Sequence, residues 1–578
     1  MKQLLLGNEA VARGLYEGGL RVVSSYPGTP STEITEALSA YPEIYSEWAP
    51  NEKVACEVAL GAAIGGARSF CAMKHVGANV AADPLFSSSY VGVNGGFVIA
   101  VADDQGMHSS QDEQDSRHYA VAAKLPMLEP ADSQECLDYA KAALSLSERF
   151  DTSVMLRLCT RVSHSQSPVE LGRREEVPLR EYQKDPRKYV MMPGNAKGRH
   201  VVVEERMKAL AQYAEDCPFN RVEMKDTAVG VITAGICYQY VTEAMPQASV
   251  LKLGMVNPLP TKLIQEFAAT VDTLYVVEEL DGVIEQHCRA IGVQVIGKER
   301  FSLLGEFSQR TIAQAVGLPL PESVAYPETV PVRPPVLCPG CPHRGLFFVL
   351  HKLGVMVSGD IGCYTLGAAP PLSAMDTTLC MGASISGLHG FNKARGEESA
   401  KRSVAVIGDS TFMHSGITGL VDMVYNRGTS TVIIVDNSTT GMTGHQNNPA
   451  NGLDIHGAPA PAVSLEELCR AVGVRRVRVV DPGDLKATEA AVREELDAPE
   501  TSVIIARRPC ALLKSVKAKP ALAIDPQKCI GCKSCLRIGC PAISMKDGKA
   551  VIDDTLCVGC GLCESLCPKG AIGSKEVQ

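Results

Sequence analysis

The feature that most constrains this chain is the spacing of eight cysteines near its C-terminal end. They occur in two near-repeats, CIGCKSCLRIGCP and CVGCGLCESLCP, and each repeat closes with Cys-Pro. Intervals of two residues require short loops, which let three sulfur atoms of one run face a single centre. The spacing therefore indicates metal or redox chemistry rather than an ordinary packed segment.

The two runs resemble the ferredoxin signature C-x2-C-x2-C-x3-C-P, in which the fourth cysteine of each run binds the other [4Fe-4S] cluster. The first run departs from it, because four residues rather than three precede Cys540. Structural zinc is the alternative, since CxxC pairs also form zinc ribbons. The expected cluster ligands are Cys529, Cys532, Cys535 and Cys567 for one cluster, and Cys557, Cys560, Cys563 and Cys540 for the other.

Cysteine usage and charge limit the class of protein. The chain has 21 Cys in 578 residues and shows no export signal, so a disulfide scaffold is disfavoured and a reduced, cytoplasmic location is expected. The formal net charge is −9 and no long basic run occurs, which argues against nucleic acid as a partner. No run approaches the roughly 20 apolar residues of a membrane span, so no membrane partner is expected.

Short apolar runs alternate with helical patterns over most of the chain, which predicts α/β layers with parallel sheets. A polar, basic stretch over residues 173–199 is interpreted as a linker. The Pro-rich stretch over residues 319–335 is the clearest domain boundary, because Pro disrupts both helices and sheets. The expected domains are residues 1–180, 200–320, 336–514 and 521–578.

A site for a hard divalent ion and a diphosphate is predicted in the third domain. The expected strand Val404–Ile407 opens into Gly408-Asp409-Ser410, and a second strand ends in Asp436-Asn437. Carboxylate and amide oxygens at adjacent strand ends suit such an ion, and ligands of open parallel sheets bind at those ends. A plain turn is the alternative for the tripeptide alone.

This arrangement resembles the motif of thiamine-diphosphate enzymes, which begins Gly-Asp-Gly and closes with Asn. Here Ser410 replaces the usual last Gly, and the run continues NSTTGMTGHQ. The resemblance implies thiamine diphosphate at Gly408, Asp409, Ser410, Asn437 and Thr439. It also implies that Asp409, Asn437 and the carbonyl of Thr439 bind Mg²⁺, which holds the diphosphate.

The same enzymes carry a catalytic Glu at the start of an Ala-rich helix, with Gly nine positions later. Glu52 and Gly61 fit that register, and the resemblance implies that Glu52 acts beside N1′ of the aminopyrimidine. Glu57 is the rival. An ordinary helix-start Glu, favoured by the helix dipole, is the alternative reading of Glu52.

A further cysteine set precedes the magnesium motif and resembles the proximal-cluster ligands of pyruvate:ferredoxin oxidoreductases. It comprises a CxxC pair, a later Gly-Cys and a cysteine after the last strand. Four thiolates would complete a third [4Fe-4S] cluster, although buried unligated cysteines are the alternative. Nine other cysteines, such as Cys56, Cys71 and Cys380, are interpreted as core residues. The expected ligands are Cys338, Cys341, Cys363 and Cys510.

Other candidate residues lie in the first domain. Thr29, in YPGTPSTE, matches the substrate-contacting Thr of 2-oxoacid:ferredoxin oxidoreductases. His75 and His108 are placed among polar loop residues, where a pocket role and a structural role are both open. The single tryptophan, Trp48, has no expected role beyond packing.

Taken in order, these parts resemble the large (alpha) subunits of the indolepyruvate branch of the 2-oxoacid:ferredoxin oxidoreductases. Matching segments include YPGTPSTE, MKHVGANVAADP, CPGCPHRG, GDIGCYTLG, CMGASI and DNSTTGMTGHQ. The resemblance implies two thiamine-diphosphate-binding-type α/β domains, a transketolase C-terminal-like α/β domain and a small α+β two-cluster ferredoxin domain.

The resemblance also implies a reaction and its partners. An aryl pyruvate such as indolepyruvate would be oxidatively decarboxylated, coenzyme A would take the acyl group, and ferredoxin would be reduced. A small beta subunit in an α2β2 assembly is implied. The alternatives are another 2-oxo acid (phenylglyoxylate, a branched-chain oxoacid or pyruvate), an electron-transfer subunit without its own thiamine chemistry, and a non-oxidative decarboxylase.

Overall fold

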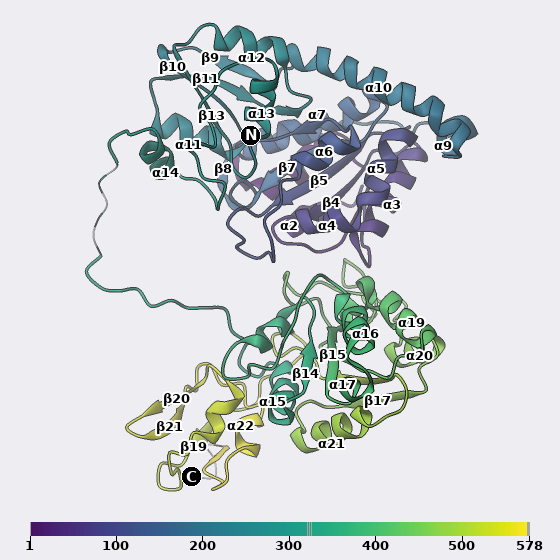
Figure 1. Ribbon diagram of the computed structural model, residues 1–578, viewed down its shortest axis with the longest axis vertical. Coiled ribbons are helices and arrows are strands. Elements are labelled where there is room, and N and C mark those ends of the chain that lie inside the picture. Colours follow the sequence, from purple (N-terminus) through teal and green to yellow (C-terminus); the bar gives the residue numbers. More distant parts are fainter. Residues whose placement is uncertain (1, 321, 323, 325, 575–578) are drawn as a thin grey trace. The chain divides into compact units, whose positions relative to one another are not determined.

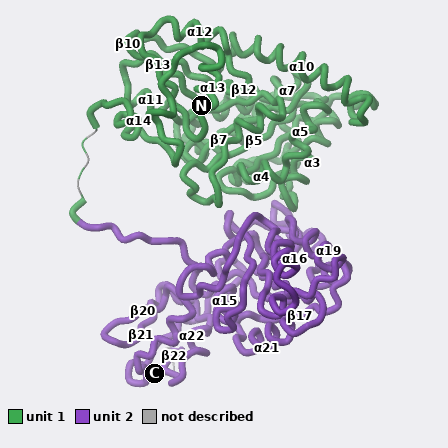
Figure 2. The backbone as a smooth tube through the Cα atoms, viewed as in Figure 1, with its two compact units in different colours: residues 1–327 green, residues 328–578 purple. Residues whose placement is uncertain are grey.

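The computed structural model describes residues 2–320, 322, 324 and 326–574. The chain divides into two units, Met1–Pro327 and Glu328–Gln578, shown in green and purple in Figure 2. The division lies within the Pro-rich stretch expected as a boundary, where Val324 and Val332 are 98% and 92% exposed. Three residues of that stretch lie outside the described residues: Pro321, Ser323 and Ala325.

The first unit is built on a seven-stranded sheet with the order β12-β6-β7-β5-β4-β2-β3. All its strands run parallel except β12, which pairs antiparallel with β6. The sequence FVIAVAD of β5 is buried at every residue, as in parallel sheets covered on both faces. The strands are β2 (Val22–Ser25), β3 (Tyr45–Trp48), β4 (Ser69–Lys74), β5 (Phe97–Asp103), β6 (Met127–Leu128), β7 (Val154–Cys159) and β12 (Met255–Asn257).

Helices cover this sheet and form two separate apolar cores. Helices α1 (Gly7–Glu17) and α7 (Ser133–Phe150) contribute to one core, and α3 (Glu52–Ile64) and α5 (Ala82–Val91) to the other. Helices α1 and α7 pack closely, because a Cβ at Gly14 would lie 2.1 Å from the carbonyl oxygen of Leu137. Figure 1 shows α3 and α5 beside each other at the edge of this layer.

A four-stranded sheet, with the order β13-β10-β11-β9, follows in the same unit. Strand β12 follows β11 in the chain but pairs with β6 of the seven-stranded sheet. The segment that forms the four-stranded sheet therefore also contributes a strand to the first sheet. The strands are β9 (Arg221–Glu223), β10 (Asp226–Ala234), β11 (Ala248–Leu253) and β13 (Thr273–Val277), and the helices are α11 (Ile236–Ala244), α12 (Thr261–Ala268), α13 (Val283–Ala290) and α14 (Gln309–Ala315).

The expected linker over residues 173–199 is partly helical, so that prediction is wrong for its C-terminal part. Helices α9 (Pro186–Tyr189) and α10 (Pro193–Glu215) begin inside it, each with Pro in its first turn. Arg199 donates to the carbonyl of Tyr90 at 2.6 Å and to Asp151 at 3.0 Å. The basic residues therefore bind the first domain, and α10 runs as one long helix (Figure 1).

The second unit contains a five-stranded parallel sheet with the order β14-β15-β16-β18-β17. Two apolar clusters fill its two sides. The strands are β14 (Met356–Ser358), β15 (Ser403–Gly408), β16 (Thr431–Asp436), β17 (Arg476–Val480) and β18 (Ser502–Arg507), and the helices are α15 (His343–Leu353), α16 (Ala383–Arg395), α19 (Ile417–Tyr425), α20 (Leu465–Ala471) and α21 (Leu485–Leu496).

A small module completes this unit. Two antiparallel strand pairs, β19 with β22 and β20 with β21, frame loops that carry the eight C-terminal cysteines. Its core includes Cys529, Cys535 and Cys563, so cysteines replace much of the usual apolar interior. The elements are β19 (Leu522–Ile524), the 3₁₀ helix Ser534–Ile538, β20 (Ile543–Lys546), β21 (Lys549–Ile552), α22 (Leu562–Ser565) and β22 (Ile572–Ser574).

Candidate functional site

Three oxygens meet where strands β15 and β16 end side by side. The amide oxygen of Asn437 lies 3.2 Å from Asp409 Oδ1 and 2.8 Å from the carbonyl oxygen of Thr439. All three residues are buried. If the amide were turned over, its nitrogen would donate to both oxygens, so the geometry suits either an inverted amide or a bound cation.

The charge on Asp409 favours the cation. Burial, reinforced by the nearby charge of Asp436, raises the pKa of Asp409 to about 7. The only side-chain donor to Asp409 among the described residues is the amide of Asn448, at 3.3 Å. Asp436, by contrast, pairs with Arg507 at 2.6 Å. A divalent cation beside Asp409, Asn437 and Thr439 would supply the missing positive charge with the oxygen ligands that Mg²⁺ prefers.

The loop after β16 is held in one conformation by its own polar side chains. Thr440 donates to Ser410 Oγ at 2.9 Å, so the Ser that replaces the usual Gly ties the two strand ends together. Thr443 donates to the side chain of Gln446 at 2.6 Å. Ser438 adopts a positive φ of 61°, which turns the chain sharply after the strand. The loop thus presents the Thr439 carbonyl toward Asp409 and Asn437.

Sequence reasoning missed two residues of this loop. Asn448 contacts Asp409, and His445 Nε2 lies 3.7 Å from Cys510 Sγ. The available signal was the continuation of the polar run to GHQNN, which has no apolar period and therefore indicates a functional loop.

Glu52 and its rival Glu57 occupy different surroundings on α3. Glu52 is buried, and a Cβ at Gly77 would lie 2.7 Å from its Oε1, so the Gly77 backbone packs against the carboxylate. Asn51 caps the helix by accepting from the Val54 amide at 2.9 Å. Glu57 is exposed and forms an ion pair with Lys53. Of the two carboxylates, only Glu52 is buried.

The remaining predicted residues of the first unit, Thr29, His75 and His108, have different surroundings. Thr29 is half-buried in a turn closed by the Ser31 hydroxyl, which donates to the Gly28 carbonyl at 2.9 Å. His75 begins helix α4 (His75–Val80) and is buried, so its predicted place in a polar loop is wrong. His108 does lie in a polar loop and pairs with Glu306 at 3.3 Å.

The structure brings together the four cysteines predicted for a proximal cluster. Burial, together with the nearby thiols of Cys338 and Cys510, raises the pKa of Cys363 to about 11. The pKa of Cys341 is raised to about 12, first by burial and also by Cys338 and Cys363. Cys341 and Cys338 also pack in the same apolar cluster of the second unit.

This cysteine set adjoins the oxygen cluster. The Cys510 amide donates to the carbonyl of Asn437 at 3.0 Å, continuing the hydrogen bonding between β16 and β18. A Cβ at Gly441 would lie 3.5 Å from Cys363 Sγ and 3.5 Å from the Asn437 amide nitrogen. Sulfur and oxygen ligands therefore share one end of the sheet.

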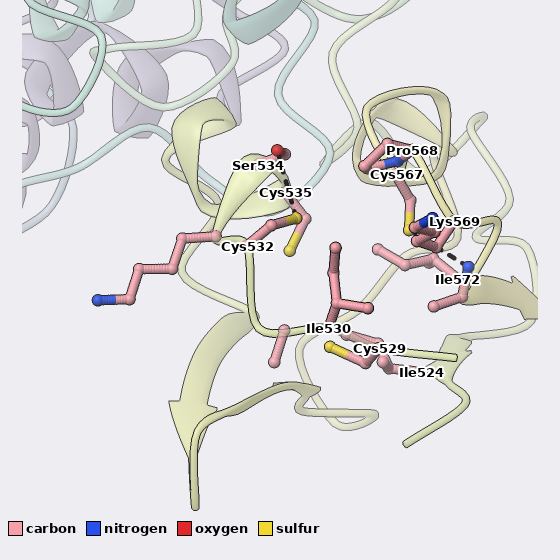
Figure 3. A pocket seen from close by; sticks show the side chains of 13 residues that line it. Ile524, Cys529, Ile530, Cys532, Ser534, Cys535, Cys567, Pro568, Lys569 and Ile572 are labelled. Carbon is pink, nitrogen blue, oxygen red and sulfur yellow. Dashed lines mark hydrogen bonds between the residues drawn. The ribbon is translucent and has the colours of Figure 1, made fainter. Parts of the chain in front are cut away.

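The C-terminal cysteines line two cavities in the crossed pattern that the sequence predicts. Figure 3 shows the first cavity, into which the side chains of one set project. Backbone amides donate to the sulfurs, from Ala571 to Cys567 at 3.2 Å and from Gly559 to Cys557 at 3.5 Å. The first cavity is lined by Cys529, Cys532, Cys535 and Cys567, and the second by Cys540, Cys557, Cys560 and Cys563.

The nine other cysteines do not gather at these sites. Eight are buried, as expected for core residues, but Cys380 is exposed, so its placement in the core is wrong. It lies between β14 and α16, outside any helix or strand assigned within the described residues.

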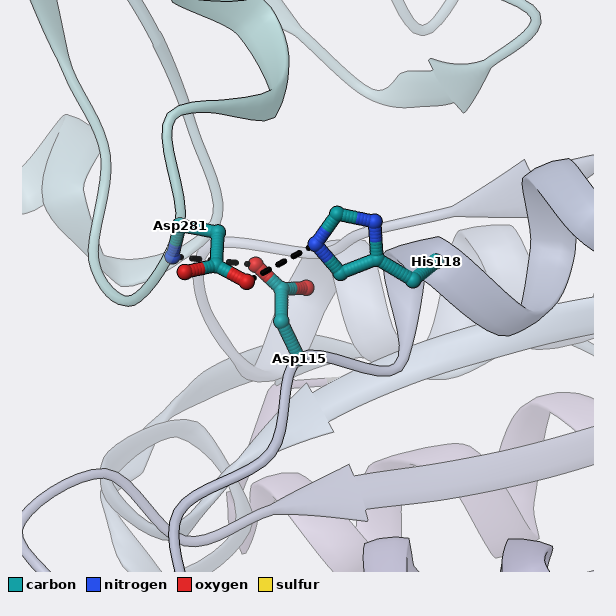
Figure 4. Close-up of side chains that lie close together, drawn as sticks. All are labelled: Asp115, His118 and Asp281. Atoms are coloured by element: carbon teal, nitrogen blue, oxygen red, sulfur yellow. Dashed lines mark hydrogen bonds and ion pairs between the residues drawn. The ribbon is translucent and has the colours of Figure 1, made fainter.

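One further polar group, Asp115, His118 and Asp281, lies in the first unit (Figure 4). His118 Nε2 lies 2.8 Å from Asp281 Oδ2. Arg117 contacts both oxygens of Asp115, at 2.9 Å from Nε and 2.6 Å from Nη2. Because a guanidinium already neutralises Asp115 and the other two side chains are exposed, we assign this group to an ion network at the surface of the first unit.

Comparison with known proteins adds three domain matches. Residues 13–215 match the model "Pyruvate flavodoxin/ferredoxin oxidoreductase, thiamine diP-bdg". Residues 360–506 match "Thiamine pyrophosphate enzyme, C-terminal TPP binding domain", and residues 521–573 match "4Fe-4S dicluster domain". The matched segments contain Glu52, the oxygen cluster and the paired cavities, respectively.

Relatives align over almost the whole chain. The indolepyruvate oxidoreductase subunit IorA of Archaeoglobus fulgidus is 41% identical, covering 99% of this chain and 97% of the relative. The protein of the same name from Methanothermobacter thermautotrophicus is 40% identical, covering 99% and 97%. A solved 2-oxoglutarate:ferredoxin oxidoreductase from Magnetococcus marinus is 18% identical with a TM-score of 0.46, covering 55% of this chain and 65% of that one.

Fold, domain matches and aligned relatives together define the class: the chain is a thiamine-diphosphate and iron–sulfur subunit of the 2-oxoacid:ferredoxin oxidoreductases. More particularly, it belongs to the family of the indolepyruvate oxidoreductase subunit IorA. No helix within the described residues has the length and apolar character that crossing a bilayer requires.

Proposed function

We propose that this chain catalyses the oxidative decarboxylation of aryl pyruvates, indolepyruvate foremost. One 2-oxo acid, one CoA and two oxidised ferredoxins give one arylacetyl-CoA, one CO₂, two reduced ferredoxins and one proton. The observation that carries the proposal is the cysteine set beside the oxygens of Asp409, Asn437 and Thr439. The choice of substrate is supported by the printed name of the aligned relatives.

The residues at the end of β15 and β16 would hold Mg²⁺ and the cofactor's diphosphate. Asp409, Asn437 and the Thr439 carbonyl would bind the ion, while Gly408 and Ser410 line the same turn. When bound, thiamine diphosphate supplies the electron sink that lets a 2-oxo acid lose CO₂. Glu52, buried at the start of α3, would exchange a proton with N1′ of the aminopyrimidine.

The twelve grouped cysteines would hold three [4Fe-4S] clusters, four thiolates to each. The two lined cavities support the paired clusters of the C-terminal module. The mutual electrostatic effects among Cys338, Cys341, Cys363 and Cys510 support a third cluster beside the magnesium ligands.

Partner proteins complete the proposal. The aligned relatives are named as subunits, and we infer a small beta subunit in an α2β2 assembly, a soluble ferredoxin as electron acceptor and a cytoplasmic location. Thr29 would contact the substrate, as expected from its turn.

The deciding experiment is turnover of a panel of 2-oxo acids with CoA and ferredoxin, the partner subunit being present. We expect indolepyruvate and phenylpyruvate to turn over fastest and to give the acyl-CoA. If phenylglyoxylate, a branched-chain oxoacid or pyruvate turned over faster, the assignment of an aryl pyruvate as substrate would be wrong. Aldehyde as the main product would replace the oxidative reaction.

Cofactor analysis tests the remaining parts. We expect thiamine diphosphate and magnesium to be bound to the purified chain. If neither were bound, the alternative of an electron-transfer subunit without its own thiamine chemistry would be supported. We expect about twelve iron atoms per chain from three four-iron clusters. A value of about eight would remove the third cluster, and a zinc signal without iron would remove all of them.

A further inference from the structure

Arg344 has an unusual environment for a charged side chain. It is the second residue of α15, and it is only 2% exposed. Its Nε donates to the carbonyl of Cys338 at 3.0 Å, and its Nη2 donates to the carbonyl of Leu337. One edge of the guanidinium therefore holds the loop that carries the first CxxC pair.

The other edge of the same guanidinium holds the C-terminal module. Nη1 of Arg344 donates to the carbonyl of Gly539 at 2.5 Å and to that of Ile538 at 3.2 Å. Gly539 directly precedes Cys540, a lining residue of the second cavity, and Ile538 lies two positions before it. A single side chain thus connects the loops of two different cysteine sets.

The charge of Arg344 is not balanced by a carboxylate. None of the ion pairs found among residues 2–320 and 326–574 includes it. A guanidinium stays protonated in proteins, and a buried cation needs a compensating negative charge. The hydrogen bonds of Arg344 reach the backbone beside cysteines of both sets, at Cys338 and next to Cys540.

This contact accounts for the departure of the first run from the ferredoxin signature. Four residues separate Cys535 from Cys540, and the last of them, Gly539, has a positive φ of 68°. A Cβ there would lie 2.9 Å from Pro371 Cδ and 3.2 Å from Arg344 Nη1. The longer loop and its glycine bring two carbonyls to the guanidinium, which a side chain at this position would push away.

Helix α15 makes a second contact with the same loop. The Arg537 guanidinium lies 5.6 Å from the ring centroid of Phe348, four residues after Arg344 and therefore on the same helix face. Ile538 is buried in the apolar cluster that includes Phe348. One face of α15 is thus the docking surface for the Cys535–Cys540 loop.

We propose that Arg344 is a positioning residue that fixes the Cys338–Cys341 loop against the Cys540 loop and places a positive charge between the two cysteine sets. This inference rests on the proposed function, since it requires clusters at both sets. The fixed charge stabilises the more negative, reduced state of a neighbouring cluster. The carbonyl contacts fix the separation of the two loops that would hold the clusters.

The test compares Arg344→Gln with a matched control, Arg478→Gln, which removes an exposed arginine paired with Glu494 in the same unit. Redox titrations followed by EPR give the reduction potential of each cluster in the full-length protein. For Arg344→Gln we expect the equilibrium constant for reducing the nearest cluster to fall roughly tenfold, about 59 mV for one electron. The control is expected to match the wild type.

Two further variants separate the charge from the docking contact. Arg344→Lys keeps the charge but cannot span four carbonyls, and Gly539→Ala keeps the charge but crowds the loop. Both are expected to retain the wild-type potential and to change the magnetic interaction between the reduced clusters. If Arg344→Gln loses iron on purification, the role of Arg344 is tested with these two variants, from their reduction potentials and the magnetic interaction between their clusters.

The outcomes distinguish this inference from the proposed function. Wild-type protein without iron–sulfur spectra would overturn both. Wild-type protein with full iron content, combined with variants whose potentials and magnetic interactions equal those of Arg478→Gln, would overturn only the role of Arg344.

Discussion

At the scale of single residues, the two carboxylates of α3 offer a controlled test of acid–base chemistry. Glu52→Gln removes the proton-exchanging group of the proposed site, so we expect turnover to fall roughly 100-fold or more, with thiamine still bound. Glu57→Gln removes only an exposed ion pair with Lys53 and is expected to leave turnover unchanged. Equal activities of the two variants, measured as CO₂ release, would contradict the assignment.

Glu279 is a second residue with a measurable consequence. Burial raises its pKa from the ordinary 4.5 to about 7, even though the Phe307 amide donates to it at 2.6 Å. A carboxyl whose pKa is raised on folding favours the folded state at low pH, and this stability is lost as the pH rises through about 7. The shift corresponds to about 3 kcal/mol.

We therefore expect Glu279→Gln to flatten the pH dependence of the melting temperature. Between pH 5 and pH 8 the wild type should lose more thermal stability than the variant, because Gln stays neutral and can still accept from the Phe307 amide. If the melting temperatures of wild type and variant changed equally with pH over that range, ionisation of Glu279 would not destabilise the folded state.

Individual site residues were predictable where local sequence places them and were missed where distant segments meet. Asp409 and Asn437 follow apolar strands that are adjacent and parallel, so their proximity follows from the sheet alone. Asn448 and Arg344 act through contacts with residues 39 and about 195 positions away, which no local pattern encodes. The helix start at His75 has no local signal, because Lys74 at the N-cap makes no side-chain cap hydrogen bond.

At the scale of elements, the close packing of α1 against α7 has a simple test. A Cβ at Gly14 would overlap the carbonyl of Leu137, so Gly14→Ala must separate the helices. We expect a loss of about 1–3 kcal/mol in the free energy of unfolding. The matched control is Gly198→Ala on α10, where no atom lies within 4 Å and helix propensity should raise stability by up to about 1 kcal/mol.

Thermal denaturation of both variants checks this prediction. A lower melting temperature for Gly14→Ala with an equal or higher one for Gly198→Ala is the expected pair of results. Equal melting temperatures would mean that α1 can shift without cost.

Elements were predictable when one face or both faces of a segment are buried. Strands β5, β7 and β15 appear in the sequence as short apolar runs, and the structure places each of them between two neighbouring strands of a sheet. Helix α10 was missed because its first turns are polar and are stabilised by contacts with Tyr90 and Asp151. The pairing of β12 with β6 joins segments about 130 residues apart and has no local signal.

At the scale of the whole molecule, the two units differ in what they carry. All twelve grouped cysteines lie in Glu328–Gln578, whereas Glu52 lies in Met1–Pro327. Limited proteolysis with an enzyme that prefers apolar residues should cut beside the exposed Val324 or Val332. We expect two stable fragments, with all the iron in the C-terminal one.

Mass spectrometry and iron analysis of the separated fragments give the result. Iron in the N-terminal fragment would contradict the ligand assignment. Rapid degradation of either fragment would contradict the independence of its core.

The hydrogen bond from the Cys510 amide to the Asn437 carbonyl has a consequence for oxidative inactivation of this protein. On the proposed ligand sets, it joins the backbone of an oxygen-sensitive metal centre to that of the magnesium site. Oxidative loss of iron at Cys510 would release the strand end that supports Asn437, and the vitamin-derived cofactor would then leave as well. Exposure to oxygen should therefore release iron and thiamine diphosphate with the same time course. Anaerobic rebuilding of the iron–sulfur cluster alone should restore the binding of thiamine diphosphate.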